Sequence, residues 1–353
     1  MTRRSPRPGR TRGGRSPLRR ITALTVAAGV LAATATACGS TGPRDLEADI
    51  RSGNVVLGTK YDQPGLGLQN PGGAITGFDA SVSTFVVNTL ADRMGVPHPE
   101  ITWKETPSAQ RETFIRNGEV DTIAATYSIT AARMKDVAFA GPYLITYQGL
   151  LTRKDDDSVR SLTDLGNGKK LCSVTGSTPA QNVKALLPNV QLQEYDSYSS
   201  CVEALRRGKV DAVTTDEIIL AGYSNRWKDE FKLVPMTYPE DVCVKGKIDG
   251  AEALVLKKSG SPFSTERYGI GMSKDFPGAV EKVDAALKTM MEVPAGGGVS
   301  PWEKSLRDAL GDETVDEMIT RANAPGSVYT FVPPVGDLSF VDSAPTPCPE
   351  GMK

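Results

Sequence analysis

Apolar residues fall into short runs that alternate with segments of helical periodicity along most of the chain. In the segment 80–94, for example, Val82, Val86 and Leu90 lie on one helical face. The strand-like runs lie at 55–58, 101–103, 123–125, 170–174, 190–195, 210–215 and 231–236. Further helical segments lie at 109–117, from 179, from 200 and at 277–322. Strands that alternate with helices are typical of βαβ units, so the pattern predicts an α/β fold with a mainly parallel sheet.

Two stretches of the chain match each other. Residues 114–126 are FIRNGEVDTIAAT, and residues 204–216 are ALRRGKVDAVTTD. Each stretch contains the end of a helix, then a glycine, then a short apolar strand. The glycine, Gly118 or Gly208, suits the positive φ that is found after a helix. Two αβ joints that share only common loop chemistry would also look alike, because glycine caps are frequent. The matching order favours two related lobes.

The repeat predicts a two-lobed α/β fold, with the lobes joined by two crossing segments at 144–151 and 263–269. The expected divisions are a leader at 1–38, a tether at 39–48, lobe 1 at 49–146 and 267–324, lobe 2 at 147–266 with an insert near 238–260, and a C-terminal extension at 325–353.

The first residues have the pattern of a signal peptide. Residues 1–20 contain eight arginines and no acidic residue, and the apolar run 21–33 follows. This run is shorter than the about 20 residues that a membrane-spanning helix needs. Small residues at 35–37 precede Cys38, as in a bacterial lipoprotein box, although Ala35 stands where leucine is usual. We expect Cys38 to carry a lipid that anchors the folded part to the outer face of the cell membrane.

The charge of the chain argues against nucleic acid as a partner. The formal net charge is -1 over 353 residues, and removal of the arginine-rich leader leaves a more acidic protein. Basic and aromatic residues are not interleaved as in nucleic-acid-binding surfaces.

Four cysteines remain after Cys38, an even number in an oxidising compartment, so we expect disulfides. Four cysteines allow three pairings. We favour Cys172 with Cys201, because a strand and the helix of the next unit often lie adjacent, which leaves Cys243 with Cys348. The alternative is that one pair stays reduced. The absence of Cys-x-x-Cys spacing argues against a metal or redox site.

Polar residues follow both strands of the repeat, at 126–128 and at Asp216. In open α/β sheets a ligand lies beyond the carboxyl ends of the strands, so we expect these residues to face a cleft. A receptor for an α-amino acid meets the ammonium with a buried carboxylate and the carboxylate with an arginine fork. Asp216 suits the ammonium. Arg133, early in an expected helix that Thr130 can cap, suits the carboxylate, with help from Ser128 and from the amides of 126–128, which include Thr126.

Each of these residues also has a simpler interpretation. Arg133 can be a solvated helix arginine, and Asp216 can be the N-cap of a helix at 217–223. A third feature favours the binding site: Thr175-Gly-Ser-Thr178 is a turn of small residues between a strand and a helix, whose amides suit an anion. It is not a Walker phosphate loop, because no Gly-Lys-Ser or Gly-Lys-Thr follows.

The chain resembles the polar amino-acid class of bacterial extracellular solute-binding proteins, and within it the glutamate-binding group of ABC importers. The resemblance covers most of residues 50–320. The motifs that carry it are GTKYDQPGLG at 58–67, GFD at 77–79, SITAAR at 128–133, SVTGST at 173–178, DAVTTD at 211–216 and YGIG at 268–271. The chain departs from the class at Ser81, where a second acid is common, and in the stretch 238–260. With the tail 328–353, this stretch suggests a disulfide-tied flap.

The resemblance implies a two-lobed fold like that of type II periplasmic binding proteins, with a two-strand hinge. It also implies a role for each residue that matches the motifs. Arg133 would clamp the α-carboxylate, and Ser128 would donate to it. Ser177 and Thr178 would close over the carboxylate from lobe 2, and Asp216 would take the ammonium. The implied ligand is glutamate first, then glutamine or aspartate.

The side-chain pocket is less well defined by the sequence. Lys60, in the first loop, is our candidate for the γ-carboxylate of glutamate, although a surface lysine is an equal alternative. Its neighbour Tyr61 completes the expected ligand-binding set.

The main alternative is a secreted enzyme of the cyclohexadienyl-dehydratase type, because such enzymes resemble this fold and fold alone does not decide function. The only histidine, His98, lies between Pro97 and Pro99, which argues against a serine–histidine triad or a histidine metal site. A ligand-sensing half of a signalling receptor would need a following transmembrane helix, and no second apolar run of that length is present.

We therefore expect a monomeric binding protein without cofactor or metal. It would close its lobes around an amino acid by hinge motion and deliver the amino acid to the permease subunits of an ABC importer.

Overall fold

The structure, a computed structural model, describes residues 42–248 and 251–352. The expected leader and the lipidated Cys38 lie outside the described residues, as does the start of the tether. Within the described ranges, no helix is both long enough and apolar enough to cross a membrane.

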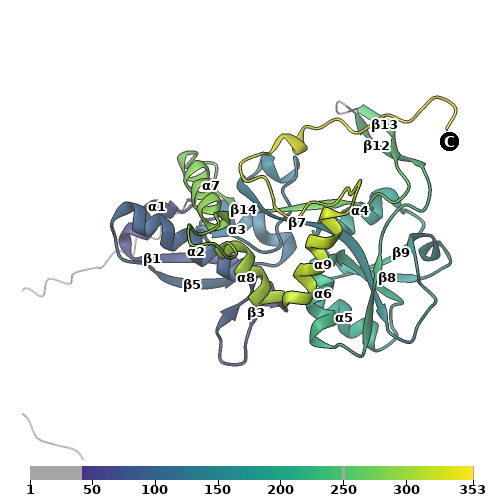
Figure 1. The fold of residues 1–353 in the computed structure, drawn as a ribbon, viewed down its shortest axis with the longest axis horizontal. Helices are drawn as coiled ribbons and strands as arrows, with labels where there is room; N and C mark the ends of the chain where they lie inside the picture. Colours follow the sequence, from purple (N-terminus) through teal and green to yellow (C-terminus); the bar gives the residue numbers. More distant parts are fainter. Residues whose placement is uncertain (1–41, 249–250, 353) are drawn as a thin grey trace, which may run out of the picture. The chain divides into compact units, whose positions relative to one another are not determined.

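A sheet of nine strands forms the centre of the fold, with helices packed along it (Figure 1). Its strands are β5 (Glu100–Glu105), β1 (Asn54–Thr59), β6 (Thr122–Ile123), β14 (Thr265–Met272), β7 (Ala138–Arg153), β10 (Ala212–Asp216), β8 (Lys170–Val174) and β9 (Gln191–Tyr195) in spatial order, with β11 (Phe231–Pro235) paired to β7. The α-helices are α1 (Leu46–Ser52), α2 (Phe78–Met94), α3 (Arg111–Arg116), α4 (Thr178–Leu186), α5 (Tyr198–Arg206), α6 (Glu217–Arg226), α7 (Gly278–Met291), α8 (Pro301–Leu310) and α9 (Asp312–Asn323).

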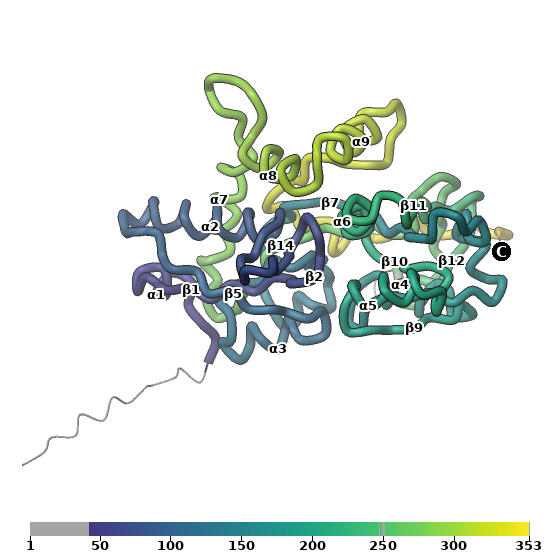
Figure 2. Tube along the Cα trace, turned by 90° about the horizontal axis from the view of Figure 1, so that it is seen from below, coloured from purple at the N-terminus to yellow at the C-terminus, as the bar shows by residue number. Residues whose placement is uncertain are grey.

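The sheet has two halves that share a pair of crossing strands. In lobe 1, β1 pairs in parallel with β5 and β6, and in lobe 2, β8 pairs in parallel with β9 and β10. The long strand β7 pairs antiparallel with β14 in its first part and with β10 and β11 in its second part. Figure 2 separates the two groups of elements, and β7 runs from one group to the other. The expected two-lobed α/β fold with a two-strand hinge is therefore present.

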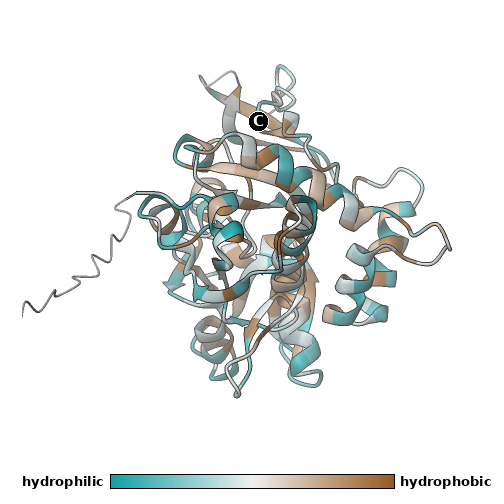
Figure 3. Cartoon of the chain, turned by 90° about the vertical axis from the view of Figure 1, so that its left-hand side faces the viewer, coloured by the Kyte–Doolittle hydropathy of each residue, from teal (hydrophilic) through white to brown (hydrophobic). Residues whose placement is uncertain are grey.

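Strand β7 is buried along nearly its whole length. Its sequence, AFAGPYLITYQGLLTR, is a continuous apolar run rather than an alternating one. Such a run is expected where both faces of a sheet are covered, because every side chain then faces protein. In Figure 3 hydrophobic residues follow the central strands, and hydrophilic residues dominate the outer helices and loops.

Two local expectations differ from the structure. The helix predicted after Thr130 is only a 3-10 turn at Arg133–Lys135, because the chain enters β7 at Ala138 and leaves no room for further turns. The Arg133 amide does donate to Thr130 Oγ1 at 3.2 Å, but Ala132 and not Thr130 is the residue that precedes the 3-10 turn. The helical tail at 277–322 is divided into α7, α8 and α9.

Two disulfides join the cysteines in the pairing that the sequence favoured. Cys172 and Cys201 link β8 to α5, with a Cα–Cα distance of 5.7 Å. Cys243 and Cys348 link the hairpin formed by β12 (Val242–Ile248) and β13 (Ala251–Lys257) to the C-terminal extension, with a Cα–Cα distance of 5.9 Å. Three short strands, β2 (Asp62–Gln63), β3 (Gly67–Gln69) and β4 (Ile75–Thr76), form a separate small sheet after β1.

Candidate functional site

A small cavity lies at the junction of the lobes, beyond the carboxyl ends of the strands. Its lining residues are Ser108, Arg111, Thr126 and Ser128 from lobe 1, and Ser177, Thr178, Pro179, Tyr198, Asp216 and Ile219 from lobe 2. The cavity measures about 10 Å³, so the lobes are closed against each other. It contains five of the eight residues that the sequence predicted for ligand binding.

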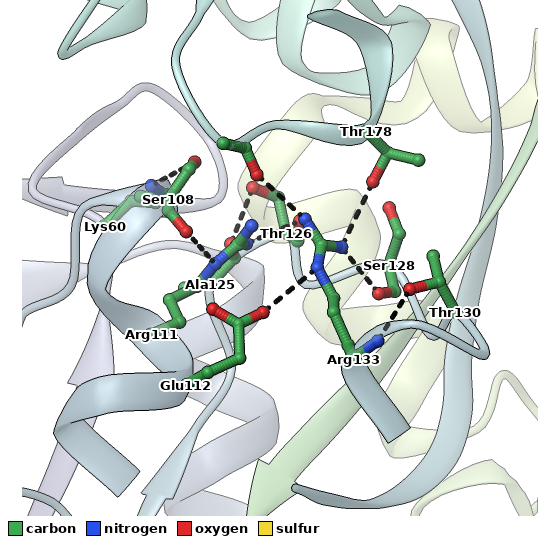
Figure 4. A network of polar contacts seen from close by, with 11 residues as sticks. Lys60, Ser108, Arg111, Glu112, Ala125, Thr126, Ser128, Thr130, Arg133 and Thr178 are labelled. Carbon is green, nitrogen blue, oxygen red and sulfur yellow. Dashed lines mark hydrogen bonds and ion pairs between the residues drawn. The ribbon is translucent and has the colours of Figure 1, made fainter. Parts of the chain in front are cut away.

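Arg133 spans the junction of the lobes (Figure 4). Its Nη1 donates to the carbonyl of Ser128 at 2.7 Å and to Thr178 Oγ1 at 3.1 Å, and its Nη2 donates to the carbonyl of Gly176 at 3.1 Å. Its Nε lies 3.3 Å from Glu112 Oε1. The side chain is buried, so the interpretation as a solvated helix arginine is wrong. A guanidinium at this place can present a fork to a carboxylate held between the lobes.

Asp216 faces the same cavity from lobe 2. It occupies the N-cap position of α6, but its side chain makes no capping bond there. Instead Oδ2 accepts a hydrogen bond from the Tyr268 hydroxyl, and Oδ1 has no partner among the described residues. Burial, and then the charge of Glu266, hold the pKa of Asp216 well above its usual range. A buried carboxylate with a free oxygen is suited to a cationic group that brings its own charge.

The strand end beneath the cavity is strained. Thr126 has φ of 48°, the one positive φ of a residue other than glycine in the described ranges. Its amide donates to Asp79 Oδ2 at 2.8 Å, and the Tyr143 hydroxyl donates to Asp79 Oδ1 at 2.7 Å. Burial raises the pKa of Asp79 to about 6, against the lowering effect of these two hydrogen bonds. Strained backbone of this kind persists where the surroundings fix it, and it is common at ligand sites.

Arg111 is the residue that the sequence analysis missed. It is fully buried at the start of α3, and its guanidinium lies 4.1 Å from the centre of the Tyr127 ring. It donates to three carbonyls, those of Ser108 at 3.2 Å, Ala125 at 3.1 Å and Thr126 at 3.3 Å. Burial, followed by the charge of Arg133, lowers the pKa of Arg111 to about 10.

Arg111 could have been found by the rule that selected Thr126 and Asp216. It follows the strand β5 closely, at the carboxyl end where ligands lie. The sequence placed it in a helix with an ordinary charged pattern, and nothing in that pattern distinguishes a buried arginine from an exposed one.

Lys60 is buried and donates from Nζ to Ser108 Oγ at 2.9 Å. The alternative interpretation of Lys60 as a surface lysine is therefore wrong. Burial lowers the pKa of Lys60 to about 7, and the neighbouring charge of Arg111 acts in the same direction. Among the described residues, neither Lys60 nor Arg111 forms an ion pair within 4.0 Å. Two cationic side chains without a carboxylate partner thus lie beside the cavity.

The turn at Thr175-Gly-Ser-Thr178 takes the place expected between β8 and α4. Ser177 is the N-cap of α4, and its Oγ accepts from the amide of Ala180 at 3.2 Å. Gly176 has φ of 76° and approaches lobe 1 so closely that an added Cβ would lie 2.7 Å from the Cα of Ala109. The turn therefore seals the cavity from the lobe 2 side.

Tyr61 is not among the residues that line the cavity. Its carbonyl accepts from the amide of Gln69 at 2.9 Å, and its side chain is half-buried. His98 is exposed and lies 2.9 Å from Asp92, outside this lining. No cluster of residues that could hold a metal ion is found in the ranges that the structure describes.

A larger cavity, of about 220 Å³, lies on β7 between β11, α6 and α9. Apolar side chains of these elements make up most of its wall, and Glu217 and Arg321, paired at 2.6 Å, stand at its edge. None of the predicted ligand-binding residues lines it.

Comparison with known proteins adds independent findings. The family described as "Bacterial extracellular solute-binding proteins, family 3" matches residues 55–294. The "Glutamate-binding protein GluB" of Corynebacterium efficiens is 48% identical over 324 residues, which are 92% of this chain and 97% of the relative. The "ABC transporter glutamine-binding protein GlnH" of Bacillus subtilis is 32% identical over 72% of this chain and 86% of its own length.

Solved structures give the same picture of the fold. "An ancestral arginine-binding protein bound to glutamine" is 27% identical, with a TM-score of 0.58, over 74% of this chain and 99% of that protein. The relatives are binding proteins and not enzymes, which supports the expectation that this chain is not an enzyme.

Proposed function

Because the chain belongs to family 3 of the bacterial extracellular solute-binding proteins, we propose that it binds a free amino acid, with glutamate as first choice, between its two lobes. It then delivers this amino acid to the permease subunits of an ABC importer. Support comes from the relatives, one of which is a glutamate-binding protein. Further support comes from the charges that line the closed cavity.

Two of these charges suit the groups that every α-amino acid carries. Arg133 already bridges lobe 1 and the turn at Gly176 and Thr178, so an α-carboxylate placed there can exchange the carbonyl acceptors for a bidentate pair. Asp216, with its free Oδ1, suits the ammonium. Asp216 lines the cavity, and Arg133 bonds to Ser128 and Thr178 of its lining, so a zwitterion in the cavity would lie between a carboxylate and a guanidinium.

The observation that carries glutamate over glutamine is the excess of cations. Besides Arg133, Lys60 and Arg111 lie beside the cavity without an ion-pair partner among the described side chains. Burying an unpaired cation is costly, and a second carboxylate offsets this cost where a neutral amide does not. Glutamate and aspartate carry that second carboxylate. The longer chain of glutamate is our first choice, as in the relatives named GluB.

An extracytoplasmic site of action follows from the family. The lipid anchor at Cys38 and a monomeric state belong to the same proposal. The apolar leader and the small residues before Cys38 support the anchor. Treatment of cells with a lipoprotein signal peptidase inhibitor, followed by detection of the uncleaved precursor, tests it. Normal processing under that treatment would show that Cys38 is not lipidated.

The ligand is tested first by a thermal-shift screen of the twenty amino acids with the chain from Gly39 onward, because a ligand of the native state raises the melting temperature. We expect the largest shift with glutamate. A largest shift with a basic or an aliphatic amino acid would contradict the proposal.

The role of the two extra cations is tested by Arg111→Met and Lys60→Met, with calorimetric titration of glutamate and glutamine. Each variant should weaken glutamate binding by about 2–4 kcal/mol, because one partner of a buried ion pair is removed, and should weaken glutamine binding less. Arg116→Met is the matched control, since Arg116 lies on the same helix and its side chain is 51% exposed. Equal losses for both ligands would remove that residue from the specificity role.

A further inference from the structure

The C-terminal extension contacts both lobes. We call residues 324–352 the strap. It follows α9, passes along lobe 1 and reaches the β12–β13 hairpin of lobe 2, and its last part is the yellow segment at the top of Figure 1. The strap has little regular structure, apart from a 3-10 turn at Ser339–Val341. Its course is therefore set by side-chain packing and by a covalent bond.

The first anchors of the strap lie on the hinge and on lobe 1. The amide of Thr330 donates to the Tyr147 hydroxyl on β7 at 2.6 Å. Phe331 packs on Trp302 with ring centres 5.2 Å apart. The amide of Gly336 donates to the carbonyl of Gly141 at 2.7 Å.

The 3-10 turn is the last of the lobe 1 anchors. Leu338, Phe340 and Val341 pack against a buried cluster of lobe 1 that includes Ile115 and Phe139. The guanidinium of Arg267, on the hinge strand β14, lies 4.4 Å from the centre of the Phe340 ring. The strap thus passes beside the hinge before it leaves lobe 1.

The last anchor lies on the hairpin of lobe 2. The amide of Cys348 donates to the carbonyl of Leu254 at 3.0 Å, and the amide of Leu256 donates to the carbonyl of Thr346 at 2.9 Å. The disulfide from Cys348 to Cys243 makes this attachment covalent. The hairpin is itself rooted in lobe 2, because Val242 and Val244 pack against its core.

These contacts make the strap a third connection between the lobes, in addition to β7 and β14. Only the six residues 342–347 separate the last anchor on lobe 1 from Cys348. Fully extended, the path from 341 to 348 reaches about 25 Å at most. All strap contacts are made with the lobes closed, and an opening that would carry Cys348 farther than this from Val341 must detach the turn at Ser339–Val341 from lobe 1.

We propose that the disulfide-closed strap restrains lobe opening and thereby slows release of the ligand. In the intact protein the hairpin end cannot detach, so separation of the lobes acts directly on the packing of Phe340 and Val341. When the disulfide is absent, the hairpin end can detach, and the open state loses this restraint. The effect on ligand release rests on the proposed function, but the effect on lobe separation does not.

The test compares the intact protein with two variants, the double variant Cys243→Ser/Cys348→Ser and a chain that ends at Val341. Both keep the lobe 1 anchors. The matched control is Cys172→Ala/Cys201→Ala, which removes a disulfide that lies within lobe 2. Circular dichroism at the assay temperature confirms folding in each case.

Lobe separation is measured first, by the distance between spin labels attached through unnatural amino acids at Ser52 and Lys209. Both positions are exposed, one on each lobe. Without ligand, we expect longer and broader distances in both strap variants than in the intact protein and in the control. Unchanged distances in both variants would overturn the proposal.

Stopped-flow displacement of glutamate then gives the dissociation rate. We expect an increase of about three- to tenfold in the strap variants and none in the control, because the restraint acts on opening. An unchanged rate in both strap variants would overturn the effect on release. If the intact protein binds no glutamate, the proposed function fails, and the distances still decide whether the strap restrains the lobes.

Discussion

Replacement of Asp216 by asparagine should have opposite effects on ligand binding and on stability. The carboxylate is buried, its Oδ1 has no partner among the described residues, and Glu266 repels it. Asparagine has nearly the same shape, and its carbonyl can still accept the hydrogen bond from Tyr268. The variant therefore removes a buried ionisable group and leaves the surrounding packing in place.

The size of each effect follows from this geometry. Loss of the charge that faces the ammonium should weaken glutamate binding by about 3–5 kcal/mol, because the ligand's charge is then buried without its partner. That corresponds to about a hundredfold to a few thousandfold in Kd. Without ligand, removal of the poorly paired carboxylate should raise the free energy of unfolding by about 1–2 kcal/mol.

The pH dependence has a definite sign. The pKa of Asp216 is raised in the folded protein, so at pH values between the unfolded and folded pKa the folded state binds more protons. This contribution to stability is present at low pH and is lost as the pH rises through that range. An ammonium beside Asp216 favours its ionised form, so ligand binding releases a proton and tightens as the pH rises.

Calorimetry in two buffers of different ionisation enthalpy measures the proton release, and urea unfolding from pH 5 to 8 measures the stability. In Asp216→Asn, proton release should be smaller and the pH dependence of stability flatter than in the intact protein. A variant that binds glutamate within about threefold of the intact protein would show that Asp216 does not face the ammonium. A variant that is less stable without ligand would refute the argument about its burial.

Two further predictions concern closure and a buried acid. Gly222 lies in α6, and an added Cβ would be 2.0 Å from the carbonyl of Pro64 in lobe 1. Gly222→Ala should therefore oppose closure and weaken glutamate binding at least about tenfold in calorimetry, without loss of stability in the empty protein. The control is Gly278→Ala, where an added Cβ meets open space. Equal glutamate affinity in the two variants would contradict the prediction. Burial raises the pKa of Asp79 to about 6, so its contribution to stability is lost as the pH rises from about 4 to 6. The difference between the unfolding free energies of the intact protein and Asp79→Asn should change by about 3 kcal/mol over that pH range. A constant difference would show that the pKa of Asp79 is not raised.

The order of the elements could be predicted because it depends on local patterns. Strand β8 has the bounds that its apolar run indicated, and α2 begins only two residues before the predicted segment. The glycines of the repeat, Gly118 and Gly208, have φ of 67° and 64°, as the helix ends required. Each of these features depends on a few neighbouring residues.

The parts that could not be predicted depend on contacts between distant segments. Arg111 is buried because the carbonyls of Ala125 and Thr126, at the end of another strand, point toward it. The turn at Arg133 stays short because β7 begins at Ala138. The course of the strap depends on Trp302 and on the hairpin, neither of which is near it in the sequence.

The charged groups buried at the junction of the lobes make closure depend on a ligand. In the closed form Asp216 is buried with one oxygen that has no partner among the described residues, Lys60 and Arg111 of lobe 1 are buried without a carboxylate within 4.0 Å in the same ranges, and Gly222 lies against Pro64. Asp216, Lys60 and Arg111 are each costly to bury without a partner. Glutamate would supply an ammonium for Asp216 and a second carboxylate for Lys60 and Arg111. Much of the free energy of binding then comes from giving these buried side chains partners of opposite charge. An amino acid that leaves one of these side chains unpaired should therefore bind to the open form without stabilising the closed form.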